Sequence, residues 1–163
     1  MHLWVKAVVV AGLVMATPAV AQDGSAIAFG GLKTDTTQPV QVTSDQLAIS
    51  QADGTAVFTG NVVIVQGAMK LQAAKVQVNY SADKKAIQNL HAEGGVTLTT
   101  GTDAATSDSA DYSPDSGELI LQGSVVLTQG PAALSGQKLI LNLASGLGTM
   151  SGRVTTIFTP GQN

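Results

Sequence analysis

The chain contains an internal repeat that covers most of its length. Residues 43–80 align without a gap with residues 106–143. The identical pairs include Thr43/Thr106, Ser44/Ser107, Asp45/Asp108, Gly54/Gly117, Gly60/Gly123, Val62/Val125, Gln66/Gln129, Gly67/Gly130, Leu71/Leu134, Lys75/Lys138 and Asn79/Asn142. Self-similarity at a fixed period is typical of stacked units that cannot bury their apolar faces alone. We therefore expect one long, layered structure with a continuous apolar interior.

The repeat divides again into shorter units. A glycine opens a Gly-x-Val stretch at Gly60, Gly94, Gly123 and Gly152, so the unit is about thirty residues long. A second set of short strands is expected to begin at Ser44, Ala73, Ser107 and Gly136. One connection, around Asp83-Lys84-Lys85, is roughly five residues longer than the others.

Strands rather than helices explain the apolar pattern. In residues 90–99, Leu90, Ala92, Val96 and Leu98 share one face while His91, Glu93, Thr97 and Thr99 share the other, and no stretch keeps a helical period. Turn dipeptides such as Asp53-Gly54 and Gln66-Gly67 separate the strands. The repeated glycines lie inside strands, where glycine marks a bulge or a corner. The pattern predicts an all-β slab that folds over on itself.

The two ends are expected to lie outside this slab. Residues 1–21 have the features of a signal peptide: a weakly basic start, an apolar run too short to span a bilayer, and Ala19-Val20-Ala21 as a cleavage site. Residues 22–38 are rich in Gly, Thr and Ser, and we expect a flexible lead-in there. We expect the folded domain over residues 39–160 and a short tail at 161–163.

Composition argues against several classes of function. The chain has no cysteine, which excludes disulfides and thiolate chemistry, and its formal net charge of −3 disfavours nucleic acid. Aromatic residues are too few to form stacking platforms for sugars or bases. We expect no catalytic and no metal-binding residues: His91 is predicted on an outer face, and the spacing of the acidic stretch Asp103, Asp108, Asp111 and Asp115 matches no calcium motif.

Residues 44–78, SDQLAISQADGTAVFTGNVVIVQGAMKLQAAKVQV, resemble the repeat of the LptA/OstA-like family of lipopolysaccharide transport periplasmic proteins. Gly60-Asn61-Val62 with Gln66-Gly67 is the most specific part. The closing segment from Gly152 to Ile157 also resembles the last strand of that family.

This resemblance implies a twisted antiparallel β-jelly roll, open at both ends, with an apolar groove along its axis. Family members stack edge to edge into a periplasmic bridge along which lipopolysaccharide moves from the inner to the outer membrane, and they do no chemistry and need no cofactor. The implied partners are lipopolysaccharide through its lipid A chains, further copies of the chain, and the inner- and outer-membrane jelly-roll proteins of the pathway. Combined with the alternation, the resemblance predicts that the groove is lined by Phe58, Val62, Ile64, Val96, Leu98, Tyr112, Leu121, Val125 and Leu127.

The ends of the slab are the predicted docking edges. Residues 40–42 and 154–158 are short, uncharged and strand-prone, and little besides Pro39 and Pro160 blocks them. Unprotected strand edges tend to pair with other chains, and head-to-tail pairing can build an open filament. The edge residues we expect to take part are Val40, Val42, Val154, Thr156 and Phe158.

Other functions remain open at this point. A structural β-repeat protein could dock or polymerise at the envelope without carrying lipid. A retained amino terminus would indicate the membrane-anchored partner of the same pathway. A polysaccharide-active β-solenoid enzyme would need an acidic cleft with aromatic residues, of which the chain has few.

Overall fold

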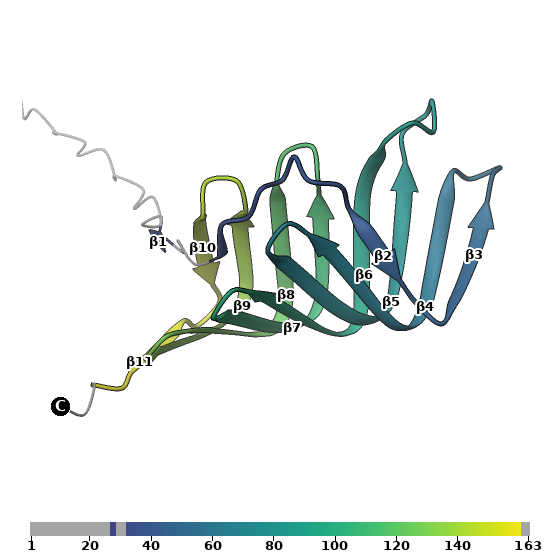
Figure 1. Cartoon of the computed structure of the whole chain (residues 1–163). Coiled ribbons are helices and arrows are strands. Elements are labelled where there is room, and N and C mark those ends of the chain that lie inside the picture. The colour runs from purple at the N-terminus through teal and green to yellow at the C-terminus, as the bar shows by residue number, and fades with distance from the viewer. Residues whose placement is uncertain (1–26, 29–31, 161–163) are drawn as a thin grey trace, which may run out of the picture.

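The computed structural model describes residues 27–28 and 32–160 (Figure 1). The predicted signal peptide, most of residues 22–31 and the tail at 161–163 lie outside the described residues. The strands are β1 (Ile27–Ala28), β2 (Gln41–Thr43), β3 (Gln46–Ser50), β4 (Thr55–Gln66), β5 (Met69–Tyr80), β6 (Ile87–Thr100), β7 (Asp103–Ser113), β8 (Glu118–Gln129), β9 (Ala132–Asn142), β10 (Leu147–Ser151) and β11 (Thr155–Phe158).

All eleven strands belong to one antiparallel sheet. The order β1-β10-β9-β8-β7-β6-β5-β4-β2 follows the chain as a meander from β4 to β10, with β3 also paired to β4 and β11 also paired to β9. The first and last strands of this order do not pair with each other, so the sheet stays open. The predicted fold class, an open all-β slab of repeated units, is confirmed.

Each long strand bends in the middle, and the bends line up across the sheet. The pairing register shifts next to Gly60 in β4, Gly94 in β6 and Gly123 in β8. Both residues of each corner have positive φ: 82° and 45° for Gly60 and Asn61, and 82° and 46° for Gly123 and Ser124. Glycine adopts this left-handed conformation at no steric cost. The repeated glycines therefore mark bulges, as the sequence predicted.

A side chain of the neighbouring strand or connection covers these corners. A Cβ atom added at Gly60 would lie 2.6 Å from the Asp45 carboxylate, and one added at Gly94 would lie 2.7 Å from the Ala74 methyl group. Asp45 also accepts a hydrogen bond of 2.9 Å from the side-chain amide of Asn61. Close approach of a neighbour is thus a second reason why glycine recurs at this place in the unit.

The row of corners divides the sheet into two layers that lie over each other like the sides of a trough (Figure 1). Layer A and layer B share β4 to β9, one half of each strand in each layer. Layer A consists of β2, β11 and residues 62–66, 69–73, 96–100, 103–107, 125–129 and 132–136; layer B consists of β1, β3, β10 and residues 55–59, 75–80, 87–93, 109–113, 118–122 and 138–142.

The inner faces of the two layers form the core. The predicted inward set Leu90, Ala92, Val96 and Leu98 is buried, each side chain at most 2% exposed. The other core residues come from the same strand positions in the remaining units, including Val76, Val78, Leu119, Leu121, Leu139 and Leu141. Period-two alternation therefore identified the inner face correctly.

The segment that leads into β2 crosses the side of the trough opposite the corners (Figure 1). Leu32 is completely buried in the core, and Thr34 is 6% exposed. The Thr34 amide donates a 2.8 Å hydrogen bond to the carbonyl of Leu143. Residues 32–38, the last part of the expected lead-in, thus pack against the domain through Leu32 and Thr34. We call residues 32–38 the strap.

Candidate functional site: the apolar interior and its two open ends

The nine predicted groove residues all lie on the inner faces of the trough. Eight of them are at most 2% exposed: Val62, Ile64, Val96, Leu98, Tyr112, Leu121, Val125 and Leu127. Phe58 is half-buried and packs against the edge of this cluster. The middle of the trough is thus a closed core in this state, and contact of these residues with lipid stays a prediction.

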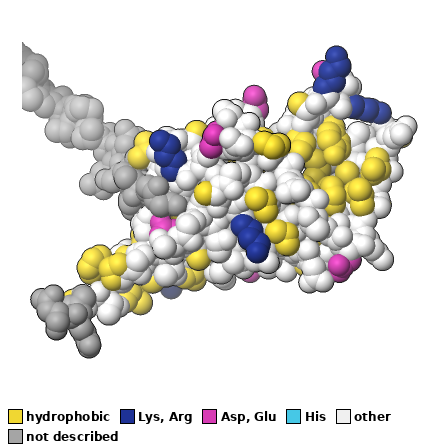
Figure 2. All heavy atoms as spheres, in the orientation of Figure 1, with side chains coloured by type: hydrophobic (Ala, Val, Ile, Leu, Met, Phe, Trp, Pro, Cys, Tyr) yellow, Lys and Arg dark blue, Asp and Glu magenta, His cyan; other side chains and the backbone are white. Residues whose placement is uncertain are grey.

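The interior becomes accessible at the end formed by β2 and β3. Leu47 and Ile49 of β3 pair with Phe58 and Ala56 of β4, which places them on the inner face of layer B. They are 51% and 66% exposed because no further strand follows β3. Hydrophobic side chains gather at this end of the molecule in Figure 2. The predicted edge residues Val40 and Val42 lie here and are half-buried.

The opposite end is formed by β10 and β11. Phe158 is 69% exposed and Val154 is 45% exposed, and Thr156 is also exposed. Thr156 and Phe158 pair with Leu134 and Ala132, so they continue the inner face of layer A. Figure 2 shows hydrophobic side chains on β11, the strand that projects from this end. All five predicted edge residues therefore lie at the two ends of the sheet.

The edges differ in how far they are covered. Within the described part of the chain, β2, β3 and β11 each pair on one side only. β10 pairs with β9 over its whole length and with β1 only at Leu147 and Gly148. Unpaired backbone N–H and C=O groups at a strand edge are a template for another strand. Both ends thus present such templates next to apolar side chains.

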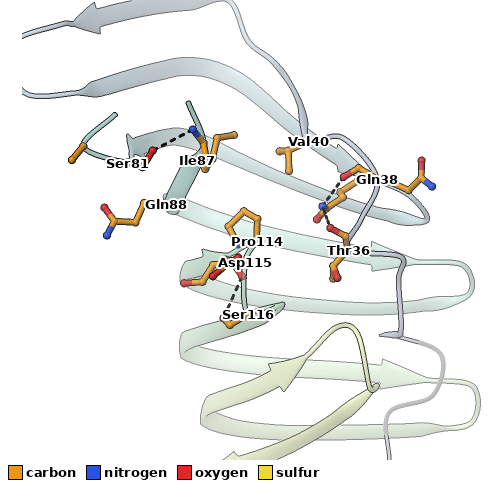
Figure 3. Close-up of a pocket in the computed structure, with 13 residues that line it drawn as sticks. Thr36, Gln38, Val40, Ser81, Ile87, Gln88, Pro114, Asp115 and Ser116 are labelled. Carbon is orange, nitrogen blue, oxygen red and sulfur yellow. Dashed lines mark hydrogen bonds between the residues drawn. The ribbon is translucent and has the colours of Figure 1, made fainter. Parts of the chain in front are cut away.

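A cavity of about 790 Å³ opens on the strap side of the trough (Figure 3). Thr36, Gln38 and Val40 line it on one side, and the β5–β6 and β7–β8 connections line it on the other. Its lining is mixed, with Ile87 and Pro114 next to Ser81, Gln88, Asp115 and Ser116. The cavity thus lies between the strap and the turns of layer B.

Gln66 joins the two layers and the strap. Its side-chain amide donates to the carbonyls of Thr36 and Gln38 at 2.9 and 2.8 Å. Its Oε1 accepts a hydrogen bond from the hydroxyl of Tyr112, which belongs to layer B. Burial of Tyr112 raises the pKa of its hydroxyl to about 12. The hydroxyl therefore remains a donor over the physiological pH range.

Two charge pairs lie on the outer faces of the sheet. His91 Nδ1 lies 2.6 Å from Asp111 Oδ1, and Lys75 Nζ lies 3.0 Å from Glu93 Oε1. The pKa of Glu93 is lowered, mainly by its hydrogen bond and charge interaction with Lys75. These two pairs join residues that face each other across neighbouring strands, which explains them without a ligand. Asp103 lies away from them: it is buried and accepts a hydrogen bond from Gln129.

The sequence analysis did not predict some residues of this site. Gln66 and Thr34 looked like turn and lead-in residues, yet both are buried and hydrogen-bonded. Leu47 and Ile49 are exposed inner-face residues at the β3 edge, and the edge residues predicted from sequence do not include them. The position of Gln66 before a repeated Gly was a usable signal, since Gln129 occupies the same place in the next repeat.

Comparison with known proteins identifies the family. The profile of the family described as LptA/(LptD N-terminal domain) LPS transport protein matches residues 41–147, which cover all of β2 to β9. The chain belongs to this family. It is therefore a member of a lipopolysaccharide transport family rather than of a family of enzymes. Among the described residues, no helix is long and apolar enough to cross a membrane.

Individual relatives agree with this assignment. An uncharacterized protein of Rhizobium meliloti is 33% identical over 94% of this chain and 90% of its own length. The lipopolysaccharide export system protein LptA of Escherichia coli is 39% identical over 66 residues, which are 40% of this chain and 34% of LptA. The LptA of Haemophilus influenzae is 38% identical over 53 residues.

A solved structure has the same fold. LptH of Pseudomonas aeruginosa, described as the LptA-homologous periplasmic component of the lipopolysaccharide transport device, superposes with a TM-score of 0.68. The match covers 78% of this chain and 99% of LptH at 18% sequence identity. At this identity the likeness shows a shared fold, the LptA-type jelly roll.

Proposed function

We propose that the chain is a periplasmic bridge protein that shields the lipid A acyl chains of lipopolysaccharide and stacks edge to edge between the two membranes. The observation that carries the proposal is the trough itself: an aliphatic interior that is exposed at both ends, each beside unpaired strand edges. LptA and LptH, which resemble it, are named as parts of the lipopolysaccharide export and transport system.

The chemistry of the interior suits a moving lipid. Val, Leu and Ile dominate the inner faces, and the buried Tyr112 hydroxyl there is hydrogen-bonded to Gln66. Burial of acyl carbons is favourable by about 0.8 kcal/mol per methylene group. Several methylene groups supply enough affinity to hold a chain, and smooth aliphatic walls lack deep pockets that would trap it.

The strand directions suit head-to-tail stacking. β2 runs toward the corner row and β3 away from it, whereas β10 runs toward that row and β11 away from it. If two copies meet with layer A on layer A, β11 lies antiparallel to β2 of the next copy, and β10 lies antiparallel to its β3. β10 and β3 are both five residues long. The contact is heterologous and leaves a free edge for the next copy.

Photo-crosslinking tests the lipid part of this proposal. A photo-reactive phenylalanine analogue at Phe58 lies at the accessible end of the interior, and the same analogue at Gln72 lies on the outer face. We expect purified lipopolysaccharide to crosslink at Phe58 and not at Gln72. Equal crosslinking at both positions, or none in a protein with native β-sheet content, contradicts a lipid-binding interior.

A second candidate function is a structural envelope protein that polymerises without lipid. The closed middle of the trough supports it, because a filament needs the exposed edges but no open groove. The Phe58 experiment separates the two candidates when it is combined with a measurement of assembly. Filaments without lipid crosslinking favour the structural protein.

A further inference from the structure

The interior of the trough is sealed along its long side. Ile64, Leu98, Leu121 and Leu127 are at most 1% exposed, so an acyl chain reaches them only if the two layers separate. The layers cannot separate at the corners, because β4 to β9 each run through both layers without a break. Separation is possible on the opposite side, where the hairpin turns of the two layers face each other.

Thr34 of the strap ties these turns together. Its amide donates to the Leu143 carbonyl of layer B at 2.8 Å. Its hydroxyl donates to the Gln66 carbonyl of layer A at 3.1 Å and accepts from the Ala68 amide at 3.1 Å. A single residue that is 6% exposed thus binds a turn of each layer.

Two further contacts hold the strap in place. The Gln66 amide donates to the strap carbonyls of Thr36 and Gln38, and Tyr112 holds the other end of the Gln66 side chain. Leu32 anchors the start of the strap in the core. The 790 Å³ cavity lies between the strap and the β5–β6 and β7–β8 turns of layer B, so the strap contacts the layer B turns over only part of its length.

We propose that residues 32–38 act as a gate over the long side of the trough, and that acyl chains reach the interior when Thr34 and Gln66 release each other. The gate is closed by hydrogen bonds between uncharged groups. Each such bond contributes only modestly to the stability of the closed state, so thermal fluctuations open the gate. Because Leu32 stays buried in the core, the released strap remains near its closed position and can form the same hydrogen bonds again. This inference rests on the proposed lipid-binding function and adds the route by which lipid enters.

A covalent lock tests the gate. The Ala68 amide is hydrogen-bonded to Thr34, the residue after Lys33, and Lys33 and Ala68 line the same pocket, so Lys33→Cys and Ala68→Cys place two thiols within reach of a short bis-maleimide. Because the chain has no cysteine, only these two sites react. The cross-linker ties the strap to the layer A turn and so prevents the release of Thr34 from Gln66 on which the gate depends. The double variant with each thiol capped separately is the control.

The measurement is the uptake rate of a fluorescent long-chain fatty acid and of fluorescent lipopolysaccharide. We expect the capped control to take up both probes at the wild-type rate and the cross-linked protein to take them up at least tenfold more slowly. Wild-type uptake by the cross-linked protein overturns the gate and leaves the proposed function intact, since lipid then enters through the ends. No uptake by the wild-type protein overturns both the proposed function and the gate.

A variant that weakens the closed gate should take up lipid faster. Thr34→Val removes the hydroxyl but keeps the shape of the side chain, and it deletes both hydrogen bonds to the layer A turn. We expect uptake to be roughly tenfold faster, the factor that corresponds to the loss of about 1.4 kcal/mol of hydrogen bonding. Thr99→Val is the matched control, because Thr99 is on the outer face of β6. Equal rates in the two folded variants contradict the gate.

Discussion

Tyr112 and Gln66 join the two layers of the trough through the interior. They are 46 residues apart in the chain, both are at most 2% exposed, and the Tyr112 hydroxyl donates to the Gln66 Oε1. The Gln66 amide in turn holds the strap through the carbonyls of Thr36 and Gln38. One side chain therefore couples the packing of the layers to the position of the strap.

Removal of the Tyr112 hydroxyl should destabilise the protein. Tyr112→Phe leaves the buried Gln66 oxygen without this donor, so we expect the free energy of unfolding to fall by about 1–3 kcal/mol. Urea unfolding followed by circular dichroism measures it, with Thr99→Val as an outer-face control. A change of less than a few tenths of a kcal/mol contradicts a role for this hydrogen bond.

The same tyrosine should make stability depend on alkaline pH. Its pKa is raised by burial from 10.0 to about 12 in the folded protein. Below pH 10 the hydroxyl is protonated in both states, and the stabilising contribution is complete. Between pH 10 and 12 the unfolded state ionises first, so stability falls. Urea midpoints across this range should fall more steeply for the wild-type protein than for Tyr112→Phe; parallel profiles contradict the shifted pKa.

Two glycines with nearly the same φ angle should differ in their tolerance of alanine. Gly60 and Gly95 have φ of 82° and 84°. A Cβ atom at Gly60 meets the Asp45 side chain, whereas one at Gly95 meets nothing within 4 Å. We expect Gly95→Ala to cost about 1–2 kcal/mol from backbone strain alone, and Gly60→Ala to cost more. Thermal unfolding of both variants tests this, and equal losses refute the steric argument.

A charge on the β3 edge should block assembly. Ile49→Lys places an ammonium group on a 66% exposed inner-face position beside the docking edge. We expect the folded variant to remain monomeric at concentrations where the wild-type protein forms head-to-tail assemblies, as measured by sedimentation velocity. Val126→Lys, at a 40% exposed position in the middle of β8, is the control. If Ile49→Lys assembles as the control does, β3 is not the docking edge.

Aspartate substitutions should distinguish residues that contact lipid from residues that only form the core. Leu127 is completely buried, so Leu127→Asp places a charge in the core and should unfold the protein. Phe58 is half-buried at the accessible end, so Phe58→Asp should remain folded but bind lipopolysaccharide at least tenfold more weakly. Fluorescence titration with labelled lipopolysaccharide measures the affinity. Wild-type affinity of folded Phe58→Asp rules out this end as a lipid contact.

The features that the sequence predicted well are those with a short-range signal. Leu90, Ala92, Val96 and Leu98 alternate along one strand, so their common face follows from strand geometry alone. Gly60 and Gly123 recur inside strands, and their positive φ explains both the bend and the choice of residue. Val42 and Phe158 lie on edge strands, as expected for segments near the two ends of a meander, and their role in docking stays a prediction.

The sequence by itself determined the strands, their inner faces and the row of corners, because each depends on neighbouring residues and repeats in every unit. Only the tertiary structure decided that the long side is closed. That closure depends on contacts such as Thr34 with Gln66, 32 residues apart, and Thr34 with Leu143. Such contacts have no local pattern: they exist because the fold brings turns of both layers together, where buried polar groups must find partners.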